Sequence, residues 1–223
     1  MNITTEMASK SLNHVGEILC GDRVQMVHRA DSDILVLADG MGSGVRANML
    51  STLTSQIFGK MLLEGATLEE CVETVVDTLP ADPRTGASYS TFTVLQIFHD
   101  GRGILYEYEN PGCIFIRGNQ LIRIPKHEED ISGKRINTYR FTAQIGDTFL
   151  IMSDFRQRRN KRGEEYGWHV AELMTPETKW GYDAVNGCNE SPEESWCRIM
   201  GQIRKYYPKT DDRAVQKVLG IRK

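Results

Sequence analysis

The chain has 223 residues, of which 40% are hydrophobic and 26% charged, and its formal net charge is −3. This length and composition suit a sizeable core, so we expect residues 1–223 to form a single domain. The charge shows no basic excess of the kind that nucleic-acid binding requires, and we therefore expect no nucleic-acid partner.

The sequence also argues against a membrane or secreted location. No apolar run approaches the roughly 20 residues that span a bilayer, and residues 1–16 lack the basic and apolar regions of a signal peptide. The five cysteines are odd in number and scattered, without the spacing of a zinc site. We expect a cytoplasmic protein with reduced thiols and no membrane partner.

The first elements predicted along the chain are two strands. Residues 24–28 alternate between apolar and polar side chains, whereas residues 34–38 are continuously apolar, as in a buried strand. The polar stretch "RADSD" between them is typical of a turn. We therefore expect an antiparallel hairpin with Asp39 at its end.

Two helices are predicted next. Apolar residues recur at helical spacing from about residue 43 to residue 63, and Gly65 can end that helix. A second helix is expected at about 67–79, with Thr67 as its N-cap. We also expect one apolar stripe of the first helix to face the core, comprising Met49, Leu53, Ile57 and Met61.

The middle of the chain has the character of a β-sheet. Five strand-like runs are divided by turn residues, with hairpin turns at 99–103 and 117–120; the runs are 89–98, 101–110, 113–124, 135–144 and 146–154. Three further elements are predicted beyond them: a weak helical segment at 168–174, a helix at 192–206 capped by Ser191, and a strand at 214–221. This order of elements is typical of an α+β fold with antiparallel sheets.

Acidic residues occur at four strand ends or adjoining turns: Asp22, Asp39, Asp154 and the pair Asp211–Asp212. For each residue alone, a turn-forming or capping role is the alternative. Carboxylates that converge from several strands repel one another unless a cation lies among them, and Mg²⁺ and Mn²⁺ favour such oxygen ligands. A pair of these ions can position and activate a water molecule for attack on phosphorus.

The segments "GD", "ADGMGSG", "SD" and "DDRAV" follow one another at residues 21–22, 38–44, 153–154 and 211–215. In this order they resemble the PPM (PP2C-type) metal-dependent protein phosphatase family, and most of all its SpoIIE-like bacterial branch. The resemblance implies a PP2C-like α-β-β-α sandwich of two mainly antiparallel sheets flanked by helices. It also implies a serine/threonine protein phosphatase that hydrolyses phosphoserine or phosphothreonine on a bacterial regulatory protein through a metal-activated water.

Carried over to this chain, the resemblance implies two Mn²⁺ or Mg²⁺ ions and a catalytic set of Asp22, Asp39, Asp154 and Asp211. Asp39 would bridge both ions, and the Gly40 carbonyl and Asp22 would serve one side of the site. Asp154 and Asp211 would hold the other ion, with Asp212 ordering a coordinated water. The implied partners are a phosphoprotein substrate and either a second copy of the chain or a regulatory protein.

Among the features that depart from the family pattern, two directly follow Asp154. Phe155 follows Asp154 where the family has glycine, and "RQRRNKR" at 156–162 carries five positive charges in place of a loop of small residues. They favour the alternative of a catalytically weakened or inactive phosphatase-fold binding or signalling module. The basic run is either a solvated loop or a docking site for an acidic phosphoprotein.

Other readings of the motifs are less well supported. A dinucleotide-binding or methyltransferase fold needs parallel β-α-β order, which the predicted hairpin before Asp39 does not provide. The five histidines have no spacing typical of a metal cluster, so we expect them to be structural or on the surface.

Overall fold

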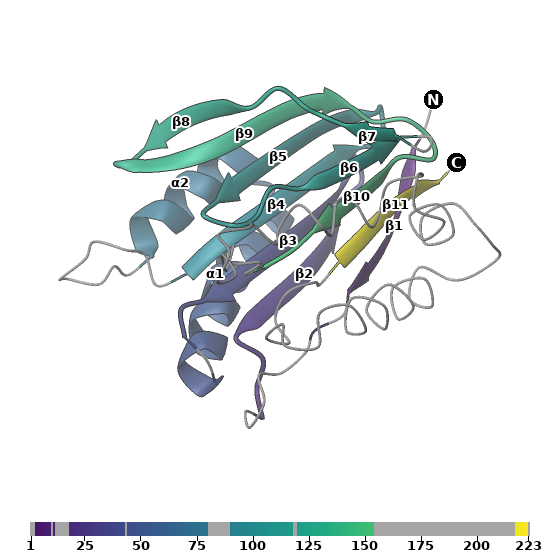
Figure 1. Cartoon of the computed structure of the whole chain (residues 1–223). Coiled ribbons are helices and arrows are strands. Elements are labelled where there is room, and N and C mark those ends of the chain that lie inside the picture. The colour runs from purple at the N-terminus through teal and green to yellow at the C-terminus, as the bar shows by residue number, and fades with distance from the viewer. Residues whose placement is uncertain are drawn as a thin grey trace, which may run out of the picture.

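The computed structural model describes residues 3–9, 11, 18–42, 44–79, 90–117, 120–153 and 217–222. Two antiparallel sheets lie face to face, and two helices cover the outer face of the larger one (Figure 1). The expected fold class, α+β with two mainly antiparallel sheets, is confirmed. The helical segments predicted at 168–174 and 192–206 lie outside the described residues.

The larger sheet has six strands, in the order β2 (Asp22–His28), β3 (Ser32–Gly40), β4 (Ser90–Phe98), β5 (Arg102–Tyr108), β9 (Lys134–Thr142) and β8 (His127–Ile131). The smaller sheet has the order β1 (Thr4–Ser9), β11 (Lys217–Arg222), β10 (Thr148–Ile151), β6 (Ile114–Arg117) and β7 (Gln120–Ile122). The helices are α1 (Gly44–Leu63) and α2 (Leu68–Thr78).

Successive side chains of β3 point to opposite faces of the six-stranded sheet, and each face forms its own core. Ile34 and Val36 pack against the helices, in a core that includes Phe58 and Val72. Leu35 and Leu37 face the smaller sheet, in a core that includes Phe149. Because Asp39 continues the odd-numbered series, it lies on the face between the two sheets, at the end where β3 leaves the core.

The predicted hairpin and both predicted helices are confirmed. The strands β2 and β3 pair in antiparallel register, and Gly65, which follows α1, takes the left-handed φ of +96° that glycine tolerates. In α2 the Thr67 hydroxyl accepts a hydrogen bond from the backbone N–H of Glu70, whose carboxylate accepts one from the Thr67 N–H. This reciprocal capping box fixes the first turn of the helix.

The predicted core stripe of α1 is wrong at its N-terminal half. Met49 is 67% exposed and Leu53 48% exposed, whereas Ile57 and Met61 are only partly buried against the core. The buried face consists mainly of small or polar residues together with Phe58 and Leu62: Gly44, Ala47, Ser51, Thr54, Ser55 and Gly59.

Small side chains let α1 approach the sheet closely. A Cβ at Gly59 would overlap the side chain of Gln25 on β2. The hydroxyls of Ser51 and Ser55 can be buried because each donates to a carbonyl of its own helix, and the buried Thr54 hydroxyl donates to that of Ser90 on β4. A prediction based on hydrophobicity alone therefore assigned the wrong face of α1 to the core.

Strands β1 and β8 were not predicted, and the last predicted strand, 214–221, corresponds to β11 at 217–222. No helix within the described ranges is long and apolar enough to cross a membrane.

Candidate functional site

Asp22 and Asp39 are opposite each other across two neighbouring strands. Asp22 begins β2, and the antiparallel register pairs it with Asp39 near the end of β3. Thr91 of β4 pairs with Asp39 from the other side. Since directly opposed residues have Cβ atoms about 5 Å apart on one face, these three residues form a row across three strands. Asp22 is only 5% exposed, whereas Asp39 and Thr91 are partly exposed.

Close packing of backbone at Gly40 fixes the end of β3. The Gly40 N–H donates to the Gly21 carbonyl at 3.1 Å, and a Cβ at Gly40 would overlap the carbonyl oxygen of Ala47 in α1. Gly42, with φ of +97°, then turns the chain into the helix. Only glycine at position 40 allows the strand end and the first turn of α1 to meet this closely.

Polar side chains of α1 and β4 hold the same backbone in place. The Asn48 amide donates to the Cys20 carbonyl at 2.8 Å, which fixes the segment leading into Asp22. The Ser90 hydroxyl donates to the Asp39 carbonyl at 2.9 Å and accepts a bond from Thr54 at 3.0 Å. The backbone around both aspartates is therefore set before any ligand binds.

One hydrogen bond joins the two sheets at this point. The hydroxyl of Ser153, which follows β10 in the smaller sheet, donates to Oδ2 of Asp22 at 2.7 Å. Ser153 is fully buried, and the two residues are 131 positions apart in the sequence. Ser153, the first residue of the "SD" motif, is thus in direct contact with Asp22, one of the predicted site carboxylates.

The remaining predicted site residues, Asp154, Asp211 and Asp212, lie outside the described residues, as do Phe155 and the basic run 156–162. The described strand ends nearest to these residues in sequence are neighbours: β10 and β11 pair with each other, and Ile151 lies opposite Lys217. Among the residues that the structure describes, no group of three or more His, Cys, Asp or Glu side chains is arranged to hold a metal.

The described part of the site fits a divalent cation in its chemistry. Its side-chain metal ligands would be two carboxylates, and hard cations such as Mg²⁺ and Mn²⁺ favour oxygen ligands. Like charges directly opposite each other in a sheet are destabilising, and Asp22 is largely withdrawn from water. A cation between the two carboxylates would offset both costs.

A polar cluster extends from Thr91 along the space between the sheets, and sequence reasoning missed it. The Thr91 hydroxyl donates to Oδ1 of Asn110 at 2.5 Å, and the Asn110 amide donates to the Thr93 hydroxyl at 3.0 Å. Thr93 pairs across the strands with Glu107, which is 1% exposed. Asn110 lies in the connection between β5 and β6, so a search for acidic residues at strand ends does not find it.

The buried carboxyl of Glu107 accepts hydrogen bonds from the Cys113 N–H at 2.6 Å and the Tyr139 hydroxyl at 2.8 Å. Burial raises the pKa of Glu107 to about 7, because it outweighs these two bonds and the charge of Lys126. Glu107 therefore changes protonation near neutral pH.

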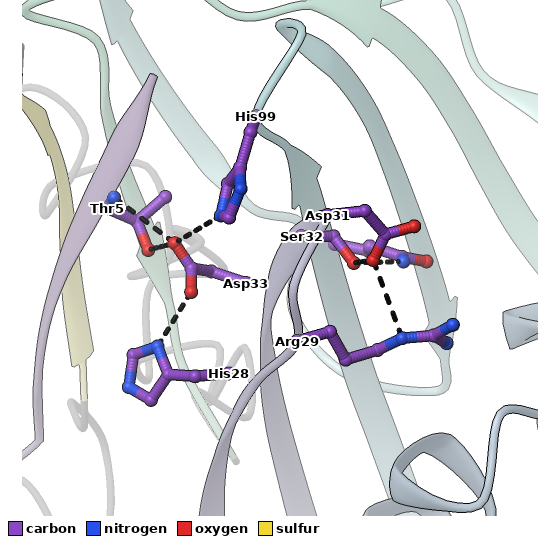
Figure 2. A network of polar contacts seen from close by, with 8 residues as sticks. Thr5, His28, Arg29, Asp31, Ser32, Asp33 and His99 are labelled. Atoms are coloured by element: carbon purple, nitrogen blue, oxygen red, sulfur yellow. Dashed lines mark hydrogen bonds and ion pairs between the residues drawn. The ribbon is translucent and has the colours of Figure 1, made fainter. Parts of the chain in front are cut away.

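The other end of the β2–β3 hairpin carries a second polar network, centred on Asp33 (Figure 2). Oδ1 of Asp33 contacts Nδ1 of His28 at 2.6 Å, and Oδ2 accepts from the Thr5 hydroxyl at 2.6 Å and lies 3.6 Å from Nε2 of His99. Burial alone would raise the pKa of Asp33, but the bonds from Thr5 and His28 outweigh it and hold that pKa below its usual range. Since Thr5 belongs to β1, the network ties the hairpin to the smaller sheet.

Several solved structures share this architecture. The PP2C phosphatase domain of the cell fate determinant SpoIIE from Bacillus subtilis, solved with a fragment of its regulatory domain, matches 99% of the chain with a TM-score of 0.76 and 18% identity. The RsbU and RsbW domains of a Mycobacterium tuberculosis protein match 99% with a TM-score of 0.71 and 17% identity. The chain spans 63% and 60% of the lengths of these two structures.

A third structure matches over its whole length. The catalytic domain of the serine/threonine protein phosphatase PstP, in complex with two manganese ions, matches 99% of the chain and 100% of its own length, with a TM-score of 0.60 and 17% identity. These likenesses show that the chain has the fold of PP2C-type phosphatase domains, as the sequence resemblance implied.

Comparisons by sequence match much less of the chain than the comparisons by structure. A family model described as "AlkZ related" matches residues 141–220, about a third of the chain and largely outside the described residues. Among curated proteins, none matches the sequence.

Proposed function

We propose that the chain is a divalent-cation-dependent phosphatase that hydrolyses phosphoserine or phosphothreonine on a regulatory protein. The observation that carries the proposal is the cross-strand pair Asp22–Asp39, which the Ser153 hydrogen bond joins to the start of the "SD" motif. A PP2C-type fold around this pair supports the assignment. The manganese ions of the PstP structure support the choice of cation.

In this proposal Asp22, Asp39 and the Gly40 carbonyl hold one side of the cation site. Asp154, Asp211 and Asp212 complete it, as the family resemblance implies. Asp154 directly follows Ser153, and consecutive Cα atoms are about 3.8 Å apart, so the hydrogen bond from Ser153 to Asp22 supports convergence of the two halves.

The described residues act mainly by holding ligands in position before the substrate binds. Ser153 fixes one oxygen of Asp22, while Ser90 and the packing at Gly40 fix the backbone that directly follows the Asp39 side chain. Mn²⁺ or Mg²⁺, when bound, would supply the positive charge that activates water and offsets charge developing on the phosphoryl oxygens. Ligands held rigidly in advance need no reorganisation during the reaction.

A second function is favoured by one feature of the sequence. Phe155 stands where the family has glycine, and a Cβ there restricts the backbone that would direct Asp154. Under this alternative the chain is a phosphatase-fold binding or signalling module with weakened or absent catalysis.

Turnover with Mn²⁺ separates the two functions. Purified protein is assayed on p-nitrophenyl phosphate and on a phosphoserine peptide, beside Asp39→Asn and the matched control Asp31→Asn, which changes an exposed aspartate in the turn of the same hairpin. The enzyme predicts manganese-dependent turnover that falls at least about a hundredfold in Asp39→Asn and persists in Asp31→Asn. A silent parent whose activity appears in Phe155→Gly would establish the weakened site instead.

A further inference from the structure

Thr91 is the third member of the row that contains the two site aspartates, and its hydroxyl has a fixed direction. Its single proton is donated to Oδ1 of Asn110 at 2.5 Å, so the oxygen offers only acceptor capacity to anything else that approaches it. Thr91 and Asp22 flank Asp39 from its two neighbouring strands. A group that binds at this end of the row and contacts Thr91 must therefore carry positive charge or donate a hydrogen bond.

The connection between β5 and β6 is held so that Asn110 reaches this position. Its amide bridges two hydroxyls of β4, accepting from Thr91 and donating to the fully buried Thr93. Farther along the connection, the Cys113 N–H is held by the buried carboxyl of Glu107. Glu109 takes a left-handed conformation with φ of +53°, which non-glycine residues rarely adopt. The turn thus accepts local strain while it delivers Asn110 to β4.

We propose that Thr91, oriented by Asn110, is a positioning residue of the Asp22–Asp39 cation site. Its hydroxyl oxygen accepts a hydrogen bond from water carried by the cation, and Asn110 prevents the hydroxyl from turning its proton toward the site. This inference rests on the proposed function, because it assumes that the aspartates bind a divalent cation. It adds two residues, from β4 and from the β5–β6 connection, that the acidic motifs do not include.

The simpler explanation is that Asn110 only ties the connection to β4. Both explanations predict some loss of stability when the hydrogen bonds are removed, so thermal unfolding alone cannot separate them. The affinity for Mn²⁺ in the absence of substrate can separate the two explanations, because a purely structural tie would leave this affinity unchanged.

The test measures the Mn²⁺ dissociation constant by calorimetry, together with the melting temperature, for Thr91→Val, Thr91→Ser and Asn110→Ala. Thr138→Val is the matched control: Thr138 lies in β9 of the same sheet, and its buried hydroxyl has no hydrogen-bond partner among the described residues. We expect Thr91→Val to weaken Mn²⁺ binding about tenfold and Asn110→Ala to weaken it less, whereas Thr91→Ser and Thr138→Val stay within about threefold of the parent.

Equal Mn²⁺ affinity in the parent and Thr91→Val would overturn the inference and leave the proposed function standing. A parent that binds no Mn²⁺ would overturn both. Loss of affinity in Thr138→Val as large as in Thr91→Val would also refute the inference, because it would trace the effect to general loosening of the sheet.

Discussion

Glu107 provides a quantitative test of the packing between the sheets. Its carboxyl is 1% exposed, and burial raises its pKa from 4.5 to about 7. At about 1.4 kcal/mol per pKa unit, ionised Glu107 costs the folded state about 3 kcal/mol at pH 8. Between pH 4.5 and about 7 the folded protein keeps a proton that the unfolded chain has lost. The contribution of Glu107 to the free energy of unfolding therefore falls as pH rises through this window.

The variant Glu107→Gln removes the charge and keeps the main contacts. Its amide oxygen can accept from the Cys113 N–H, and its amide hydrogens can donate to the Tyr139 oxygen, so both bonds of the parent have a replacement. We expect parent and variant to have similar stability near pH 4.5. At pH 8 the variant should be more stable by up to about 3 kcal/mol.

Urea unfolding followed by circular dichroism at pH 5 and at pH 8 measures both free energies. Glu109→Gln, which changes an exposed carboxylate two residues away, is the control and should retain the parent's dependence on pH. The reasoning is refuted if Glu107→Gln shows the same dependence as the parent, or if it is the less stable protein at pH 8.

Three further predictions concern the local structure and are measured by thermal or denaturant unfolding. Gly40→Ala should destabilise the fold by about 1–3 kcal/mol, because the new methyl group meets the Ala47 carbonyl; a loss below about 0.5 kcal/mol would contradict this. Thr67→Ala should cost about 1 kcal/mol through loss of the capping box, and an unchanged stability would contradict it. Phe58→Ala should cost about 3–5 kcal/mol, whereas Met49→Ala, on the exposed face of the same helix, should change stability by less than about 0.5 kcal/mol. If Phe58→Ala and Met49→Ala lost similar stability, the apolar stripe predicted for α1 would face the core after all.

The elements predicted correctly from the sequence are those whose local signals agree with their packing. In α2 the N-cap at Thr67 and the buried positions Leu68, Cys71 and Val72 follow from local sequence and spacing. The edge strand β8, "HEEDI", is mostly exposed and gives no apolar alternation, so nothing in its sequence distinguishes it from a loop. In α1 the buried face depends on how closely the helix approaches β2, which is a tertiary property.

The same distinction applies to the candidate site. Asp22 and Asp39 could be singled out because each lies at the end of a strand, a feature visible in the local sequence. Their pairing with each other depends on the hairpin register, which the short turn between β2 and β3 specifies. Thr91 and Asn110 become neighbours only through the order of strands in the six-stranded sheet and the path of the β5–β6 connection.

The bond between Ser153 and Asp22 is the contact on which the whole site assignment depends most. It crosses from one sheet to the other, between residues 131 positions apart, and both partners are buried. A buried carboxylate that loses such a donor pays a desolvation cost, so Ser153→Ala should destabilise the fold, most of all without a cation. Because a bound cation would offset part of that cost, the loss should shrink when Mn²⁺ is added, as the melting temperature of parent and variant with and without Mn²⁺ would measure. A loss that Mn²⁺ leaves unchanged would make this bond structural alone and would separate Asp22 from the proposed cation site.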